Sequence, residues 1–343
     1  MGSASYVATR VLMTIPTVIL LLTFIFFFVR VLPGDPVLLH FEKQAKPEAI
    51  ESLRHQLGFD KPLLDQYLDY TFGIIRGDFG KSMEDFSPVS DQVLSAFPAT
   101  LELSLFSMII AVVVGVVLGV VASRSYNSST DHLLRFFGVA VYATPIFFIG
   151  MILQMVFGIG LHMLPTGGRT YPGMEPYGLS LGGITIKTGL YTIDSILEGN
   201  PLKFILALQY LFLPSVTLGL YLSGIFLRLT RSNMLDTLFA EFTVAARARG
   251  IKAKTVLYSY ALRNALLPIF TMMGLEFAAL LGGAVLTETT FSWPGLGRYL
   301  VQRIAFRDYT AIQGAVVYFA LVVSITSLVV DLAYSYLDPR IRV

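Results

Sequence analysis

Long apolar runs alternate with shorter polar stretches along this chain of 343 residues. A run must hold about 20 residues to cross the hydrocarbon core of a bilayer as a helix. Six runs reach that length, so the pattern predicts an all-α integral membrane protein with six transmembrane helices. They cover Val11 to Leu32, Thr100 to Ala122, Leu133 to Leu161, Phe204 to Leu227, Ala265 to Leu286 and Ala311 to Leu337.

The first run divides the chain into three regions. Residues 1–32 hold the N-terminus and the first expected helix, 33–98 form a polar segment, and 99–343 hold the other five expected helices. The first run lacks a small-residue cleavage site, so we expect a membrane anchor and not a signal peptide that is removed.

The polar segments contain shorter elements of their own. Within 33–98 the pattern predicts short helices at Pro47 to Leu57 and at Pro62 to Ile75. The Gly-rich loop that follows the third run alternates apolar and polar residues at Gly183 to Lys187 and again at Leu190 to Ile193. Alternation over short stretches is typical of strands, and these two predict a small hairpin.

The distribution of Lys and Arg predicts the orientation, because cytoplasmic loops carry an excess of both. If both termini are cytoplasmic, the inner pieces are 1–10, 124–135, 228–263 and 338–343. They hold 12 of the 25 Lys and Arg residues, whereas acidic residues concentrate in 35–91. We therefore expect both termini and the 236–263 loop in the cytoplasm, and 33–98 outside.

The composition limits the kinds of binding and catalytic site that we expect in this chain. The chain is 55% hydrophobic and only 14% charged, where soluble domains carry nearer a quarter, and its net charge of +2 gives no reason to expect a nucleic-acid partner. It has no cysteine, and its four histidines are scattered, so no metal site is predicted. No P-loop and no nucleophile motif are present, so we expect neither an ATP site nor a catalytic residue in this chain.

The loop from Asp236 to Pro268 is the longest basic stretch between expected spans. Residues 236–250 predict a short amphipathic helix with one narrow apolar stripe, which consists of Leu235, Leu238, Phe239, Phe242 and Ala246. Gly250 stands where a left-handed residue would end it, with Arg247 and Arg249 in the last turn. The helix is too polar to span, so we expect it to dock another protein; its narrow stripe argues against simple adhesion to lipid.

Glu276 lies near the middle of the fifth run, where an ionised group in lipid is costly and must face protein or water. Two interpretations remain open, a contact between helices and a place on a translocation path. Four prolines within the runs predict kinks, and they are Pro16, Pro145, Pro214 and Pro268.

Motifs along nearly the whole chain resemble one family, the permeases of dipeptide, oligopeptide and nickel ABC importers. The coupling signature of such permeases is matched by Glu241, Ala245, Ala246, Gly250, Leu267 and Pro268. Further matches are Pro33-Gly-Asp-Pro36, Gly77-Asp-Phe-Gly-Lys-Ser82, Pro98-Ala-Thr-Leu-Glu-Leu103, Leu164-Pro-Thr-Gly-Gly-Arg169, Glu288-Thr-Thr-Phe-Ser-Trp-Pro-Gly-Leu-Gly297 and Asp338-Pro-Arg340. The chain departs from the family at Lys252, where a serine is usual, and at Glu276, where a neutral residue is usual.

The resemblance implies a type I importer architecture in the cell membrane, with both termini cytoplasmic. It implies four partners: a second related permease, two cytoplasmic ATPase subunits that bind ATP and Mg²⁺, and an external solute-binding protein. The outer face would be formed by 33–98, 162–203 and 288–307. The coupling residues would be Glu241, Ala245, Ala246, Arg247, Arg249 and Gly250, with Glu276 on the translocation path.

The expected substrate is a short peptide, and the chain would supply half of an alternating-access pathway without a cofactor of its own. Within the same family, nickel and oligosaccharides are alternative substrates. From another class, a stand-alone channel or ion-coupled carrier with Glu276 as its ion site is the alternative. The chain has no convincing internal repeat, which counts against a carrier built from inverted halves.

Overall fold

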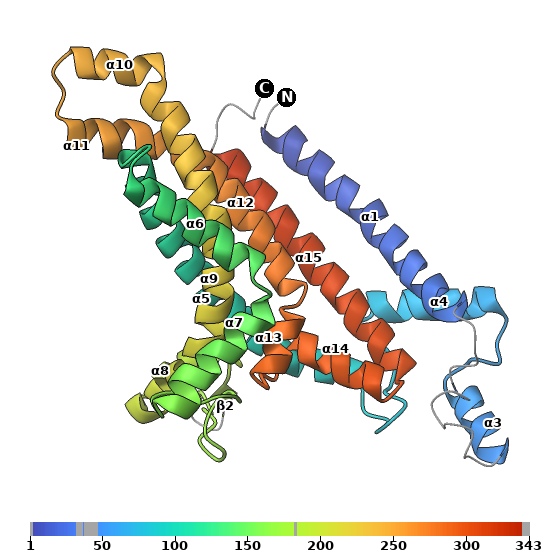
Figure 1. Ribbon diagram of the computed structural model, residues 1–343. Coiled ribbons are helices and arrows are strands. Elements are labelled where there is room, and N and C mark those ends of the chain that lie inside the picture. Colours follow the sequence, from blue (N-terminus) through green and yellow to red (C-terminus); the bar gives the residue numbers. More distant parts are fainter. Residues whose placement is uncertain (1–2, 32–36, 38–46, 182–183, 338–343) are drawn as a thin grey trace.

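The computed structural model describes residues 3–31, 37, 47–181 and 184–337, and almost all of its regular structure is helical (Figure 1). The long helices are α1 (Ser3–Val31), α5 (Val89–Arg124), α6 (Ser129–Ala143), α9 (Pro201–Phe239), α12 (Arg263–Leu281) and α15 (Tyr309–Leu337). The shorter ones are α3 (Pro47–Gln56), α4 (Leu63–Ile75), α7 (Ile146–Leu153), α8 (Tyr191–Leu197), α10 (Glu241–Ala248), α11 (Ala253–Thr255), α13 (Val285–Thr290) and α14 (Leu296–Ala305). Two π-helical segments, η1 (Gln154–Gly160) and η2 (Val256–Leu262), continue α7 and α11.

Four of these helices are long and apolar enough to cross a membrane, over Val89–Arg124, Pro201–Phe239, Ala253–Leu281 and Tyr309–Leu332. A fifth span is counted if α6 and α7–η1, which form a bent pair, cross together. In α1 the described apolar stretch, Leu12–Phe28, is shorter. The fold is thus that of an all-α membrane protein with four to five candidate spans among the described residues.

The third apolar run is not one straight helix, and its break falls at Pro145, one of the prolines for which the sequence predicted a kink. It divides at Pro145 into α6 and α7, and the axes bend by 101°. Thr144 is extended, with φ −80° and ψ 131°, as residues before proline tend to be, and Pro145 has no N–H to continue the helical ladder. The fifth run ends early for a similar local reason, since Gly283 at φ 122° separates α12 from α13.

The expected hairpin exists, but it lies earlier in the chain. Strands β1 (Leu179–Leu181) and β2 (Ile184–Ile186) are antiparallel, and Leu179 pairs with Ile186. Gly183 lies outside the described residues, and the second expected strand is instead the start of α8. There the carboxylate of Asp194 accepts hydrogen bonds from the backbone N–H groups of Thr188 and Gly189, just before α8. These bonds favour the start of a helix over a strand in this segment. Helices α3 and α4 begin and end within a residue of the expected bounds.

Helices α5 and α9 form the centre of the molecule and cross closely, because glycines on α5 leave no side chain between the two backbones. A Cβ atom on Gly119 would lie 2.5 Å from Cβ of Thr230. The two ends of the molecule differ (Figure 1). The α10 end also holds the start of α1 and the last turns of α15, and the opposite end, here the distal end, holds α3, α8, α14 and the hairpin.

Candidate functional site

The expected 236–250 helix is interrupted, and this corrects the sequence interpretation. Helix α9 continues to Phe239, Ala240 is extended with ψ 149°, and α10 begins at Glu241. The fully buried Thr243 donates a hydrogen bond from Oγ1 to the carbonyl oxygen of Thr237, 2.6 Å away, which holds the turn. The expected apolar stripe is therefore divided between two helices, and Phe242 is 44% exposed.

Gly250 ends the loop helix in the expected way. Its φ of 75° is left-handed, and its N–H donates to the carbonyl oxygen of Arg247 at 2.9 Å. Space around the position is open, since no heavy atom of the chain lies within 4 Å of a Cβ placed there. The requirement for glycine is thus conformational and not steric. The next helix, α11, begins at Ala253, and its N-cap residue Lys252 makes no side-chain capping hydrogen bond, as the missing serine predicts.

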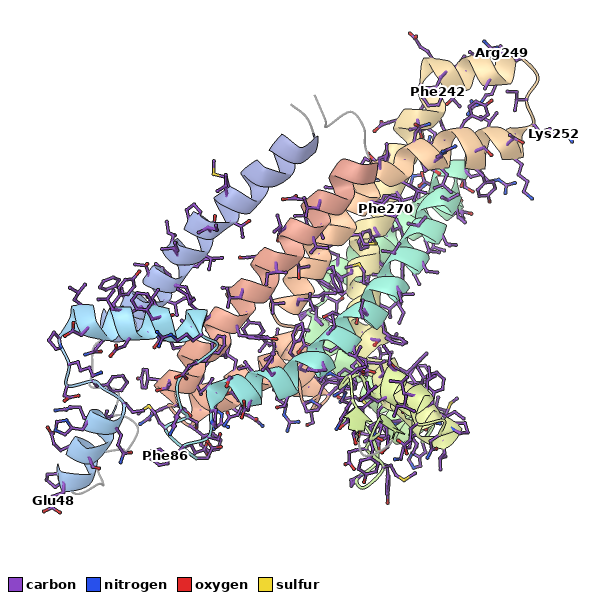
Figure 2. All side chains as sticks on the ribbon, turned by 180° about the vertical axis from the view of Figure 1, so that it is seen from behind. Glu48, Phe86, Phe242, Arg249, Lys252 and Phe270 are labelled. Atoms are coloured by element: carbon purple, nitrogen blue, oxygen red, sulfur yellow. The ribbon has the colours of Figure 1, made fainter. Side chains whose placement is uncertain are left out.

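Most of the predicted coupling residues lie together on the outside of α10, which projects beyond the bundle (Figure 2). Ala246 is the exception: it is 3% exposed and packs inward. The exposed residues are Glu241, Ala245, Arg247, Arg249 and Gly250. Beside α10, a hollow of about 700 Å³ is lined by the ends of α5 and α9, by α11 and η2, and by Arg247 of α10. The arrangement presents a small charged and apolar surface on a firmly held turn, which suits protein docking.

A buried ion pair that the sequence analysis missed braces the same end. Arg231 of α9 donates from Nε and Nη2 to the two carboxylate oxygens of Asp131 on α6, at 2.6 and 2.7 Å. Asp131 also accepts from the backbone N–H of Asn127 at 3.0 Å. These side chains are 100 positions apart, so no local pattern could have paired them.

Glu276 lies five positions before the end of α12 and is half-buried. Among the described residues, no hydrogen-bond or ion-pair partner is found for its carboxylate. Its neighbours on the same helix, Met273 and Phe277, pack against the main core cluster together with Tyr221 of α9. The structure thus brings Glu276 beside α9 and does not join it to the coupling residues.

A buried polar cluster connects α5 to the loop before α8, near the distal end. Arg169 donates from Nη2 to Oε2 of Glu102 at 2.6 Å, and the two side chains are 7% and 2% exposed. Oε1 of Glu102 accepts from both the N–H and the hydroxyl of Thr192. The guanidinium also lies over the Tyr191 ring, 3.8 Å from its centroid. Both carboxylate oxygens of Glu102, and Nε and Nη2 of Arg169, therefore have hydrogen-bond partners.

A second cluster fixes the turn between α13 and α14 against α5. The fully buried Glu288 accepts from Thr100 Oγ1 at 2.7 Å and from the backbone N–H of Arg298 at 2.9 Å. Thr100 in turn accepts from the N–H of Leu296. The buried indole of Trp293 donates to the carbonyl oxygen of Ala99 at 2.9 Å. The motif residues of α5 and of 288–297 thus meet each other.

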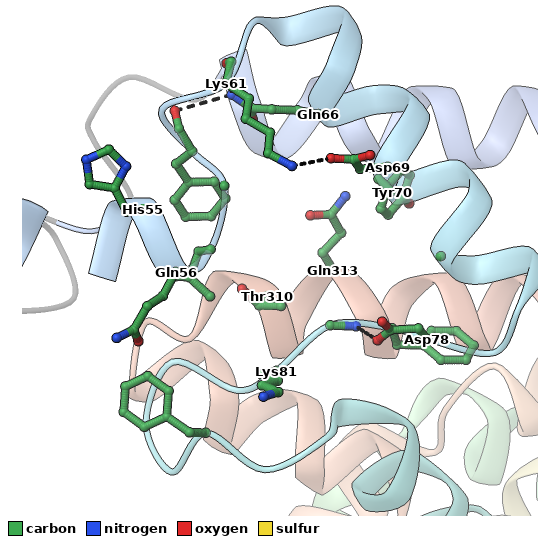
Figure 3. Close-up of a pocket in the computed structure, with 17 residues that line it drawn as sticks. His55, Gln56, Lys61, Gln66, Asp69, Tyr70, Asp78, Lys81, Thr310 and Gln313 are labelled. Atoms are coloured by element: carbon green, nitrogen blue, oxygen red, sulfur yellow. Dashed lines mark hydrogen bonds and ion pairs between the residues drawn. The ribbon is translucent and has the colours of Figure 1, made fainter. Parts of the chain in front are cut away.

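The distal end is hollowed where the 47–81 region meets the first turns of α15 (Figure 3). The pocket has a volume of about 590 Å³. Lys61 forms an ion pair with Asp69 at 2.7 Å on its wall, and Gln313 of α15 points toward this pair. Gln66 is held by donating to the carbonyl oxygens of Phe59 and Lys61. The polar segment after α1 is therefore an ordered part of this end between 47 and 88.

Comparison with known proteins covers both parts of the chain. The family described as binding-protein-dependent transport system inner membrane component matches residues 115–343, and the family described as the N-terminal part of such a membrane component matches residues 4–104. The di/tripeptide transport system permease protein DppB of Pseudomonas aeruginosa (strain UCBPP-PA14) is 39% identical over 339 residues, 98% of each chain.

Two relatives from Escherichia coli (strain K12) extend the comparison. The dipeptide transport system permease protein DppB is 38% identical over 338 residues, 98% of each chain. The glutathione transport system permease protein GsiC is 36% identical over 338 residues, 98% of this chain and 99% of the relative. Since the family matches most of the chain and these relatives match it from end to end, this chain belongs to the inner membrane components of binding-protein-dependent transport systems, the permeases of ABC importers.

Proposed function

We propose that this chain is the permease subunit of an ATP-driven importer of short peptides and forms half of its translocation pathway. The observation that carries the proposal is the match over 98% of the chain to relatives named as di/tripeptide and dipeptide permeases. The similarity to a glutathione permease supports the same substrate class, because glutathione is itself a small peptide.

In this proposal the chain crosses the cell membrane six times, with both termini and α10 in the cytoplasm. It pairs with a second, related permease, and two ATPase subunits bind ATP and Mg²⁺ outside this chain. A solute-binding protein delivers peptide at the distal end, where 47–98, 162–203 and 288–307 form the surface. The common position of α10, the start of α1 and the last turns of α15, opposite α3 and α14, supports this topology.

The α10 turn is built to pass motion into the spans. Thr243 ties the start of α10 to the last turn of α9, and the buried Ala246 anchors its inner side. Beyond Lys252, helices α11, η2 and α12 follow one another without a break. A displacement of α10 by closing ATPase subunits is therefore transmitted to α9 on one side and to α12 on the other.

Reconstitution tests the proposal. The complete transporter in proteoliposomes, supplied with binding protein and ATP, should accumulate a radiolabelled dipeptide, and this chain alone should accumulate none. Accumulation by the single chain would favour the stand-alone carrier instead. Failure of the complete transporter to move any dipeptide or tripeptide would contradict the substrate class.

Impermeant maleimide labelling checks the topology, because the native chain has no cysteine. Ser52 on α3 and Lys254 on α11 are both exposed in the isolated chain. We expect Ser52→Cys to be labelled in intact cells, whereas Lys254→Cys should be labelled only after the membrane is opened. The reverse pattern would invert the orientation and remove the cytoplasmic role of α10.

Glu241→Ala should weaken the binding of an ATPase subunit, since Glu241 is an exposed acid at the start of α10. At that position its negative charge also stabilises the helix by interacting with the helix dipole. The measurement is the amount of ATPase subunit that co-purifies with the permease. Asp236→Ala, which removes another exposed acid five positions earlier on α9, is the matched control and should leave that amount unchanged. Equal recovery from both variants would make Glu241 an ordinary solvated residue.

Glu276→Gln removes a charge from α12 while keeping the shape of the side chain. If Glu276 faces the path, the variant should assemble normally and lose a modest preference for basic over neutral peptides. The measurement is the uptake ratio of a matched cationic and neutral dipeptide into proteoliposomes. An unchanged ratio with normal assembly would reject the path position, and failed assembly would support the helix-contact interpretation.

A further inference from the structure

Helices α6, α9 and α12 share a partly uncovered face that carries polar side chains midway along the bundle. The rings of Tyr142 on α6 and Tyr221 on α9 stack with centroids 5.4 Å apart and an interplanar angle of 25°. Glu276 on α12 is near enough to Tyr221 for an electrostatic interaction. Tyr221 and Glu276 are half-buried and Tyr142 is 43% exposed, so the described chain leaves all three accessible from one side.

Toward the α10 end of the molecule, this face contains a hollow that is lined by arginines. The hollow has a volume of about 280 Å³ and lies between α6 and α9. The guanidinium carbon of Arg228 stands 5.5 Å from the centroid of the Tyr142 ring, so the arginine continues the row of tyrosines. Arg231 also lines the hollow, but its charge is matched by Asp131. Arg228 forms no ion pair with any residue that the structure describes.

This face differs in kind from the apolar surface of α5. Between positions 105 and 121 of α5, the exposed residues are all aliphatic, and they are Leu105, Ile109, Val113, Val117 and Val121. An aliphatic stripe suits lipid, whereas an acid, two phenols and a guanidinium need water or protein around them. The α6–α9–α12 face therefore belongs on the side of the chain that borders the aqueous path.

Along α9, the position beside Glu276 and the position of Arg228 are separated by about the length of a short peptide. Tyr221, beside Glu276, and Arg228 are seven positions apart on α9, or roughly 10 Å at 1.5 Å per residue. An extended chain spans about 3.3–3.6 Å per residue, so a tripeptide reaches a similar distance. A free tripeptide carries an ammonium group at one end and a carboxylate at the other.

We infer that Glu276, the Tyr142–Tyr221 pair and Arg228 form a transit site for short peptides with free termini. Glu276 attracts the ammonium group, Arg228 attracts the carboxylate, and the tyrosine rings contact the peptide between them. Ring faces make apolar contacts with many side chains, so the site tolerates different peptides. Arg228 is exposed and Glu276 is half-buried, so water partly screens both charges and keeps the attraction weak enough for release. The inference rests on the proposed function and adds to it the residues that recognise the peptide ends.

Photocrosslinking in the complete transporter tests the contact directly. A benzophenone amino acid is placed at position 142, and radiolabelled trialanine is delivered by the binding protein before the complex is trapped with ADP and vanadate. We expect this chain to be labelled at position 142. The control is position 136 on the same helix, where Phe136 is 72% exposed and outside the tyrosine row, and no label is expected there. Equal labelling at both positions, or none at 142, would overturn the inference.

Uptake of trialanine into proteoliposomes at saturating binding protein supplies the second measurement. Arg228→Gln should slow uptake about fivefold, as expected for the loss of one exposed charge contact, and Arg228→Lys should restore most of it. If the wild-type complex takes up trialanine and Arg228→Gln matches it, the transit site is wrong while the proposed function stands. If the wild-type complex takes up no peptide, the proposed function itself fails. A variant that no longer assembles would show that this face is a packing surface and would also overturn the site.

Discussion

Replacing Gly250 by valine is expected to abolish stimulation of ATP hydrolysis by substrate while leaving the chain in the membrane. The residue holds φ 75°, a conformation that costs non-glycine residues roughly 1–2 kcal/mol, and more when they are β-branched. No atom crowds the position, so valine acts only by forcing the backbone away from this turn. The connection from α10 to α11 would then leave in another direction, and displacement of α10 would no longer reach α12. The measurement is ATP hydrolysis by the assembled complex with and without substrate-loaded binding protein.

Gly250→Asn is the matched control for this experiment. Asparagine adds a side chain but visits the left-handed region far more readily than valine does. We therefore expect it to keep most of the stimulation. Full stimulation in Gly250→Val would contradict the role of the turn in coupling, and equal loss in both variants would point to a requirement for open space at this position.

Glu102→Ala is expected to destabilise the whole permease. Arg169 is 7% exposed and would lose the one carboxylate partner that it has among the described residues, and the N–H of Thr192 would lose its acceptor. Removing one member of a buried ion pair costs roughly 3–5 kcal/mol, because the other charge stays buried without compensation. We expect a clear drop in the thermal unfolding midpoint of the purified transporter, together with a low yield of intact complex.

Two further variants separate the buried pair from ordinary surface charge. Glu102→Leu combined with Arg169→Met removes both charges and should recover much of the stability that Glu102→Ala loses. Asp69→Ala breaks the exposed pair with Lys61, whose side chain is 52% exposed, and should shift the midpoint little. A Glu102→Ala protein as stable as the wild type would show that the cluster near the distal end is not needed for stability.

Local patterns in the sequence predicted much of the fold. The apolar runs, the short helices α3 and α4 and the left-handed Gly250 all follow from composition over a few turns. Errors arose where one side chain redirected the backbone. Thr243 interrupts the loop helix by bonding back to Thr237, and Asp194 makes a helix start where alternation favoured a strand.

The candidate site was predictable only in part. The exposed side of α10 follows from the family motif, but the inward position of Ala246 depends on where α10 begins. The ion pairs that brace the bundle join positions 67 and 100 residues apart, Glu102 with Arg169 and Asp131 with Arg231. No local sequence pattern around these four residues indicates which of them pair, because only the tertiary fold brings each pair together.

The contacts between α5 and the 288–297 turn also constrain the order in which the chain is completed. Thr100 and Glu288 are 188 positions apart, and Ala99 and Trp293 are 194 apart. During synthesis α5 is therefore made long before its partners. The carboxyl group of Glu102 has no partner until Arg169 is made, and the hydroxyl of Thr100 does not accept from Leu296 until the 288–297 turn is made. Contacts this distant in sequence form late, since a long loop has to close first. The distal end of α5 thus closes late, and until the 288–297 turn is synthesised this newly inserted helix holds unsatisfied polar groups.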